Sequence, residues 1–126
     1  MKSILVNVLY ISLFITLFSC KHDATGVADL NQVDFKTQVL PIYINNCTMS
    51  GCHGTDGNKR LKLTDYQSIV SEVTPGKPYQ SNAYTETTNA WSPMPPSPRQ
   101  PLSQKQRSLI YVWILQGAKP DTISHK

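Results

Sequence analysis

Cysteine and histidine are scarce in this sequence, which has three of each among its 126 residues. A structural zinc site takes four such ligands, usually from two pairs. Only Cys47 and Cys52 lie close together, and the two histidines away from this pair, His22 and His125, fall near opposite ends of the chain. A zinc site is therefore the least favoured use of these residues.

Charges of one sign form no long run in the chain, and the three cations Lys59, Arg60 and Lys62 are interpreted as a solvated turn, with a docking patch as the alternative. Twelve Lys and Arg and eight Asp and Glu give a net charge of +4, and they are scattered. A nucleic-acid interface usually carries a clustered basic patch. The sequence also lacks a Ser-His-Asp set, a pair of catalytic carboxylates and a phosphate-binding glycine loop. We therefore expect no nucleic-acid partner, and a protein that is not an enzyme.

Only one long apolar run is present, at residues 4–18 after Lys2. It is shorter than the ~20 residues that span a bilayer, and three polar residues interrupt it. This pattern favours an export signal over a retained membrane anchor. The run ends in LFSC, residues 17–20, which resembles the lipobox of bacterial lipoproteins.

The lipobox resemblance implies that Cys20 is diacylated and becomes the new N-terminus. Acyl chains would hold the protein at a membrane surface without a spanning helix. An ordinary signal peptide that leaves Cys20 as a stray thiol is the alternative. We predict a signal peptide at 1–19, a lipidated flexible tether at 20–32, one domain at 33–120 and a tail at 121–126. The protein would be exported and membrane-anchored, facing the periplasm or the cell surface.

The pattern of the domain is helical, with no convincing strand. The first predicted helix begins after Asp34, a suitable N-cap, and runs almost to Cys47. Pro41 interrupts it, so we expect a kink or a restart between Gln38 and Pro41. One face of this helix is apolar and consists of Phe35, Val39, Ile42 and Tyr43.

The last predicted helix lies between residues 102 and 117. Ser103 and Gln106 form a capping-box pair at its start, and Gly117 with Pro120 forms a stop signal. Its inward stripe consists of Leu109, Ile110, Trp113 and Ile114. Two short helices are expected between the long ones, with Thr64 and Ser81 as their N-caps. So thin a core usually relies on disulfides, a metal or a large cofactor.

Cys47, Cys52 and His53 form the segment CTMSGCH. A disulfide would close only a short loop and would leave the histidine unexplained. Covalent haem uses the pattern C-x-x-C-H, with the histidine as iron ligand. Here the spacer has four residues, and cysteines five apart lie about 140° apart on a regular helix. Attachment of one haem therefore requires the spacer to leave the helical path, with Gly51 as the expected pivot.

A second axial ligand for such a haem is commonly a methionine. Met1 is removed with the signal, and Met49 lies inside the cysteine loop. Met94 stands in SPMPPSP, where prolines stiffen the chain around its sulfur. Met94 is therefore the expected ligand, and the alternative is a core methionine in a proline-rich turn.

The ordered set VLPIYINNC, CHG, VTPGKPYQS, MPP and LSQKQRSLIYVWILQGA resembles the small c-type cytochrome domains of exported bacterial proteins. The resemblance covers about residues 33–119. It implies an all-α, class I cytochrome c-like fold, with crossing N- and C-terminal helices, short middle helices and long loops around one haem. One haem c would be attached through Cys47 and Cys52, with His53 and Met94 as iron ligands.

Two further roles are implied by the resemblance. Trp113 would pack beside the haem and the helix crossing, and the carbonyl of Pro75 would accept a hydrogen bond from His53. The implied function is a membrane-anchored monohaem cytochrome that passes single electrons between redox partner proteins. The alternatives are a haem-bearing sensor or assembly module of a larger membrane complex, and a small haem peroxidase.

Overall fold

The computed structural model describes residues 30–57 and 60–120. The predicted signal peptide, Cys20 and the C-terminal tail lie outside these residues, as does most of the predicted tether. Within the described ranges the secondary structure is helical and includes no strand, so the prediction of an all-α protein is confirmed. No helix in these ranges is long and apolar enough to cross a membrane.

The first helical segment consists of a π-helix, η3 (Phe35–Val39), followed directly by α2 (Leu40–Cys47). Asp34 caps η3, and its carboxylate accepts a hydrogen bond of 2.7 Å from the backbone N–H of Thr37. The predicted restart is a change of helix type at Leu40. Pro41 then lies in the first turn of α2, a position that proline commonly occupies. The whole predicted apolar face is buried.

Helix α3 (Tyr66–Val70) begins one residue later than its predicted cap implies. The N-cap is Asp65, whose carboxylate accepts a 2.9 Å hydrogen bond from the N–H of Ser68. The prediction of Thr64 as cap was wrong, because the Thr64 hydroxyl donates to the Asp65 carboxylate instead.

The next elements are a short 3-10 helix, η4 (Pro78–Gln80), and α4 (Asn82–Thr88). Ser81 precedes α4 as predicted, but its side chain makes no capping bond. The hydroxyl accepts a 2.9 Å hydrogen bond from the N–H of Thr74 and donates one of 2.9 Å to the carbonyl of Lys77. Ser81 is therefore the N-cap residue of α4 by position, as predicted, but its hydroxyl closes the preceding TPGKP turn instead of capping the helix.

We expect Ser81→Ala to lower the free energy of unfolding by about 1–3 kcal/mol, because it leaves part-buried backbone groups of the turn without a partner. Ser81 is only 1 % exposed, so water cannot replace the hydroxyl. Denaturant unfolding measures the change. Ser108→Ala, at an exposed position of the last helix, is the matched control and should be nearly neutral. Equal stabilities of the two variants would contradict a structural role for Ser81.

The last helix, α5 (Gln104–Leu115), has the predicted capping box. The N–H of Ser103 donates to the side-chain oxygen of Gln106 at 2.8 Å, and the N–H of Gln106 donates to the Ser103 hydroxyl at 3.3 Å. The helix ends before Gly117, which has φ +97°, a conformation that glycine adopts without strain. Of the predicted inward stripe, three residues are buried and Leu109 is half-buried.

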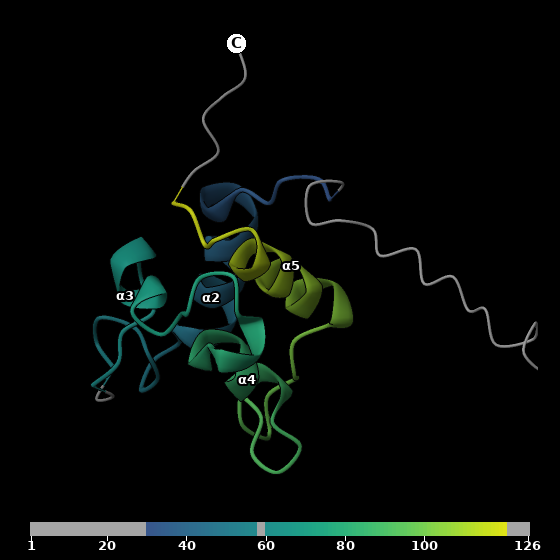
Figure 1. Ribbon diagram of the computed structural model, residues 1–126. Coiled ribbons are helices and arrows are strands. Elements are labelled where there is room, and N and C mark those ends of the chain that lie inside the picture. The colour runs from purple at the N-terminus through teal and green to yellow at the C-terminus, as the bar shows by residue number, and fades with distance from the viewer. Residues whose placement is uncertain (1–29, 58–59, 121–126) are drawn as a thin grey trace, which may run out of the picture.

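Helix α5 packs across the start of the domain and also contacts η4 and α4 (Figure 1). Phe35 of η3 and Trp113 of α5 meet with ring centroids 5.1 Å apart, and Tyr66 of α3 packs edge-on against Phe35 at 5.2 Å. The Trp113 indole N–H donates to the carbonyl of Lys119 at 2.8 Å, so its one polar atom is satisfied. The expected contact between the N- and C-terminal helices is therefore made through η3 and α5.

Candidate functional site

The cysteine segment leaves the helical path where the sequence predicts. Helix α2 ends at Cys47, and Gly51 has φ +77°. The N–H of Cys52 then donates to the carbonyl of Met49 at 2.9 Å, which closes a tight turn between the two cysteines. The prediction of Gly51 as the pivot is confirmed.

Two glycines after the histidine permit close backbone approaches that no side chain would allow. A Cβ on Gly54 would collide with the carbonyl oxygen of Thr48, and a Cβ on Gly57 would collide with that of Cys52. The ammonium group of Lys62 also donates to the carbonyl of Gly57. The chain after the second cysteine is therefore folded back tightly onto the cysteine turn.

His53 is fixed by hydrogen bonds at its backbone and at its ring. Its N–H donates to the carbonyl of Cys47 at 2.9 Å, and its own carbonyl accepts from the N–H of Leu63 at 2.9 Å. Ring atom Nδ1 lies 3.0 Å from the carbonyl oxygen of Leu61. A carbonyl only accepts, so Nδ1 carries the proton and Nε2 is left as a basic nitrogen that can bind a metal.

The ring partner differs from the one implied by the family resemblance. Pro75 is exposed, and the N–H of its neighbour Gly76 donates to the carbonyl of Ile114 at 2.8 Å. The TPG turn therefore belongs to the end of α5, and the assignment of the Pro75 carbonyl to His53 was wrong. Leu61 supplies the acceptor instead. No side-chain pattern could have revealed it, because a backbone carbonyl has no signature in the sequence.

Two adjoining cavities lie beside His53, with volumes of about 110 and 260 Å³. Cys47, His53 and Met94 line both cavities, and Cys52 lines the smaller one. The four residues predicted as haem contacts therefore all line the smaller cavity, although more than forty positions separate His53 from Met94. Together the two volumes reach the lower part of the ~300–1,000 Å³ range of small-molecule and cofactor pockets.

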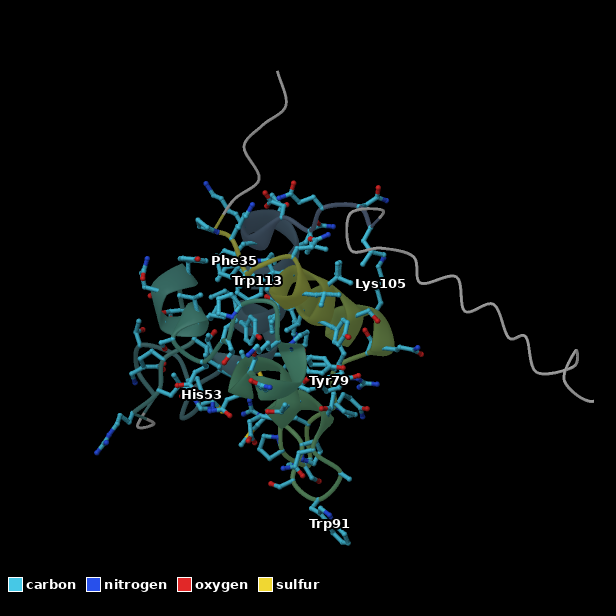
Figure 2. The ribbon with its side chains drawn as sticks, in the orientation of Figure 1. Phe35, His53, Tyr79, Trp91, Lys105 and Trp113 are labelled. Atoms are coloured by element: carbon cyan, nitrogen blue, oxygen red, sulfur yellow. The ribbon has the colours of Figure 1, made fainter. Side chains whose placement is uncertain are left out.

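Met94 is half-buried, and its N–H donates to the carbonyl of Glu86 at 2.8 Å. Just before it, the Asn89 side chain accepts hydrogen bonds from the N–H groups of Trp91 and Ser92, which turns the chain toward the cavities. Trp91 itself lies at the tip of this loop, far from the body of the domain (Figure 2). Met49, by contrast, is 41 % exposed and lines neither cavity.

The larger cavity has an apolar wall and a polar one. Tyr43, Leu63 and Ala83 supply apolar surface, and the hydroxyl of Tyr43 donates to the carbonyl of Ala83 at 2.8 Å. Burial raises the pKa of Tyr43, so its hydroxyl stays protonated in this wall. Four polar residues that the sequence did not single out also line it: Glu72, Asn82, Glu86 and Thr87.

Both cysteines of the segment are free thiols. Burial, and to a smaller extent the charge of Cys52, raise the pKa of the Cys47 thiol to about 11. The thiol therefore stays protonated at neutral pH, whereas a catalytic cysteine needs an accessible thiolate. In the described residues, moreover, no group of three or more His, Cys, Asp or Glu side chains gathers where a metal ion could bind.

Arg99 borders the smaller cavity together with His53 and Met94. Its Nη1 is buried and has no hydrogen-bond partner, the only such side-chain atom in the part of the chain that the structure describes. Leaving a buried charged donor unpaired costs about 1–3 kcal/mol or more. The sequence carried a signal for this residue, since Arg99 is the only charge between Glu86 and Lys105.

Trp113 is not a cavity residue. It lines neither space beside His53, and Figure 2 shows it next to Phe35 and well apart from His53. The expectation that Trp113 packs at the helix crossing is confirmed, whereas its packing beside a haem stays a prediction that these two cavities do not support. The aromatic partners Phe35 and Tyr66 hold it in the core instead.

The chain matches no protein-family model, no curated protein and no solved structure. An imidazole with a free Nε2, a half-buried thioether and two thiols border a largely apolar space with one unpaired guanidinium at its edge. This set of groups fits a haem, which offers iron, vinyl groups and carboxylates to them.

Proposed function

We propose that this protein is a membrane-anchored monohaem c-type cytochrome that transfers single electrons between redox partner proteins. One observation carries the proposal: His53, with its ring fixed through Nδ1, borders the same cavities as Met94, and both cysteines stand in the wall. A disulfide or a lone thiol would give no reason for this joint placement.

Each of the four residues would have a separate task. His53 would ligate iron through Nε2, because the Leu61 carbonyl keeps the proton on Nδ1. The Met94 sulfur would be the second axial ligand. Cys47 and Cys52 would hold the vinyl side chains through thioether bonds. The haem would supply a one-electron iron couple when bound.

The surrounding residues would exclude water from the iron ligands. Apolar groups of Tyr43, Leu61, Leu63 and Ala83 form much of the wall of the larger cavity. A methionine ligand and a dry environment both favour the reduced, less charged state of such a centre and so raise its potential. Met94 would also fill the sixth coordination position of the iron, which a peroxidase keeps vacant. We therefore propose an electron carrier in place of a peroxidase.

The arrangement of helices is consistent with a class I cytochrome c-like fold, which we propose for residues 33–120. Contact between η3 and α5 through Phe35 and Trp113 corresponds to the crossing of terminal helices in that fold. The short helices α3 and α4, with the loops around them, supply the cavity walls.

Attachment to a membrane through a lipidated Cys20 is part of the same proposal. Residues 20–32 would then form the tether. The Gln116 side chain donates hydrogen bonds to the carbonyls of Leu30 and Asn31 and so ties the end of this segment to the domain. Residues 20–29 would be the part left to extend, and at about 3.3–3.6 Å per residue they would let the domain move roughly 30 Å from the lipid surface. Such a reach would suit exchange with partners in or near the membrane.

The proposal is tested by a pyridine haemochrome spectrum of the denatured protein, expressed with a haem-attachment system. We expect one haem per chain to remain covalently bound through denaturation. Cys47→Ala with Cys52→Ala should abolish the covalent signal, because no thiol is left in the segment to form a thioether.

Thr48→Ala with Ser50→Ala, which changes two residues of the same turn and keeps both cysteines, is the control and should retain attached haem. Absence of covalent haem from the unmodified protein would overturn the proposal and favour a disulfide between Cys47 and Cys52. Electron exchange with a candidate partner then separates a carrier from a sensor or an assembly module.

A further inference from the structure

The unpaired guanidinium of Arg99 points to a group that the protein itself does not provide. A guanidinium stays charged at all physiological pH values. Within the described residues, Arg99 makes no side-chain hydrogen bond and no ion pair, yet its Nη1 is buried. The smaller cavity that Arg99 borders has no Asp or Glu in its lining. The two glutamates near the site, Glu72 and Glu86, line the larger cavity instead.

The segment that carries Arg99 has little else to hold it in place. Residues 95–101 read PPSPRQP, and four of these seven are prolines, which have no N–H to donate. Among the residues that the structure describes, the segment's one hydrogen bond runs from the N–H of Arg99 to the carbonyl of Pro96, inside the segment, at 3.1 Å. Its flanks are fixed at Met94 and at Leu102.

We propose that Arg99 binds a carboxylate of the haem and thereby fastens the Met94 loop to the cofactor at a second point. This inference rests on the proposed function. A haem carries carboxylates at its edge, and a guanidinium fork binds a carboxylate through two parallel hydrogen bonds. Such a contact would offset the positive charge of this half-buried arginine and satisfy its unpaired Nη1.

Arg99 is a positioning residue in this scheme, because it acts through Met94. The two residues lie five positions apart on one proline-stiffened loop. If the loop moves away so that another ligand can replace the Met94 sulfur, the Arg99 contact breaks as well. Arg99 should therefore make the methionine harder to displace.

The test measures imidazole binding to the ferric holoprotein, with loss of the methionine–iron charge-transfer band as the readout. Arg99→Gln should retain covalent haem and the band, but bind imidazole about tenfold more tightly or better, as expected for loss of a charged hydrogen bond. Its reduction potential should also fall, because a nearby positive charge has been removed. Arg60→Gln removes the same charge from an exposed position that lines neither cavity, and is the matched control.

Equal imidazole affinities and equal potentials in Arg99→Gln and Arg60→Gln would overturn the inference while leaving the cytochrome proposal intact. Absence of covalent haem from the unmodified protein would instead overturn the cytochrome proposal itself. The two failures are therefore distinguishable.

Arg99→Lys serves if the glutamine variant does not accumulate. It keeps the charge but loses the planar fork, so the carboxylate bending band in the resonance Raman spectrum should move. An identical band in Arg99→Lys and the unmodified protein would overturn the contact.

Discussion

Replacing Met94 with alanine should abolish the methionine–iron charge-transfer band at the red end of the absorption spectrum and leave the covalent haem in place. Cys47 and Cys52, which would hold the haem, lie on another segment around the end of α2. Removal of the methionine side chain therefore does not affect haem attachment. The open position should then bind imidazole or cyanide readily, and the reduction potential should fall, because methionine ligation raises it. Absorption spectra and potentiometry of the purified variant measure both changes.

Met49→Ala is the matched control, since it removes the same side chain from a position that is 41 % exposed and outside both cavities. Its band and potential should stay as they are in the unmodified protein. A band that survives Met94→Ala would show that another group ligates the iron. A protein that never shows the band, and turns over peroxide with a vacant sixth position, would favour the peroxidase alternative.

Gly57→Ala should destabilise the protein by about 3 kcal/mol or more and sharply reduce the yield of covalent haem. The added Cβ would collide with the carbonyl oxygen of Cys52, which is backbone and cannot rotate away as a side chain would. The collision can be relieved only if Cys52, or His53 beside it, moves. The free energy of unfolding and the yield of attached haem should therefore fall together. Denaturant unfolding and the haem-to-protein ratio measure the two effects.

Thr55→Ala is the control for this substitution, because Thr55 is exposed in the same loop, between Gly54 and Gly57. It should change stability by no more than about 0.5 kcal/mol. Similar losses in the two variants would mean that the whole loop is sensitive, and that the close approach of Gly57 to Cys52 has no special role.

The long helices could be predicted because their signals are local. The Asp34 cap, the Ser103–Gln106 capping box and the Gly117 stop act within one or two turns, and each is present in the structure. The shift of the α3 cap from Thr64 to Asp65 had a local cause too. Both residues suit the position, and only the geometry of the turn decides which side chain reaches the helix N–H groups.

The candidate site and the turns around it could be predicted only in part. Gly51 as pivot followed from the geometry of the cysteine spacing. Met94 as the expected iron ligand followed from the elimination of the other methionines, and the structure places this residue in the lining of both cavities. The Leu61 acceptor and the closing role of Ser81 depend on how distant backbone groups meet after folding. Contacts of this kind require no periodic pattern and no particular residue type, so they cannot be predicted from the sequence.

The contact between the His53 ring and Leu61 has a consequence for how this sequence could change during evolution. Because the acceptor is a main-chain oxygen, every amino acid at position 61 carries it, and no single point mutation there deletes it. Leu61 can be replaced by other residues that keep the wall of the larger cavity apolar. The tautomer of the histidine is thus inherited with the path of the chain, so related proteins could conserve it while sharing no residue identity at that position.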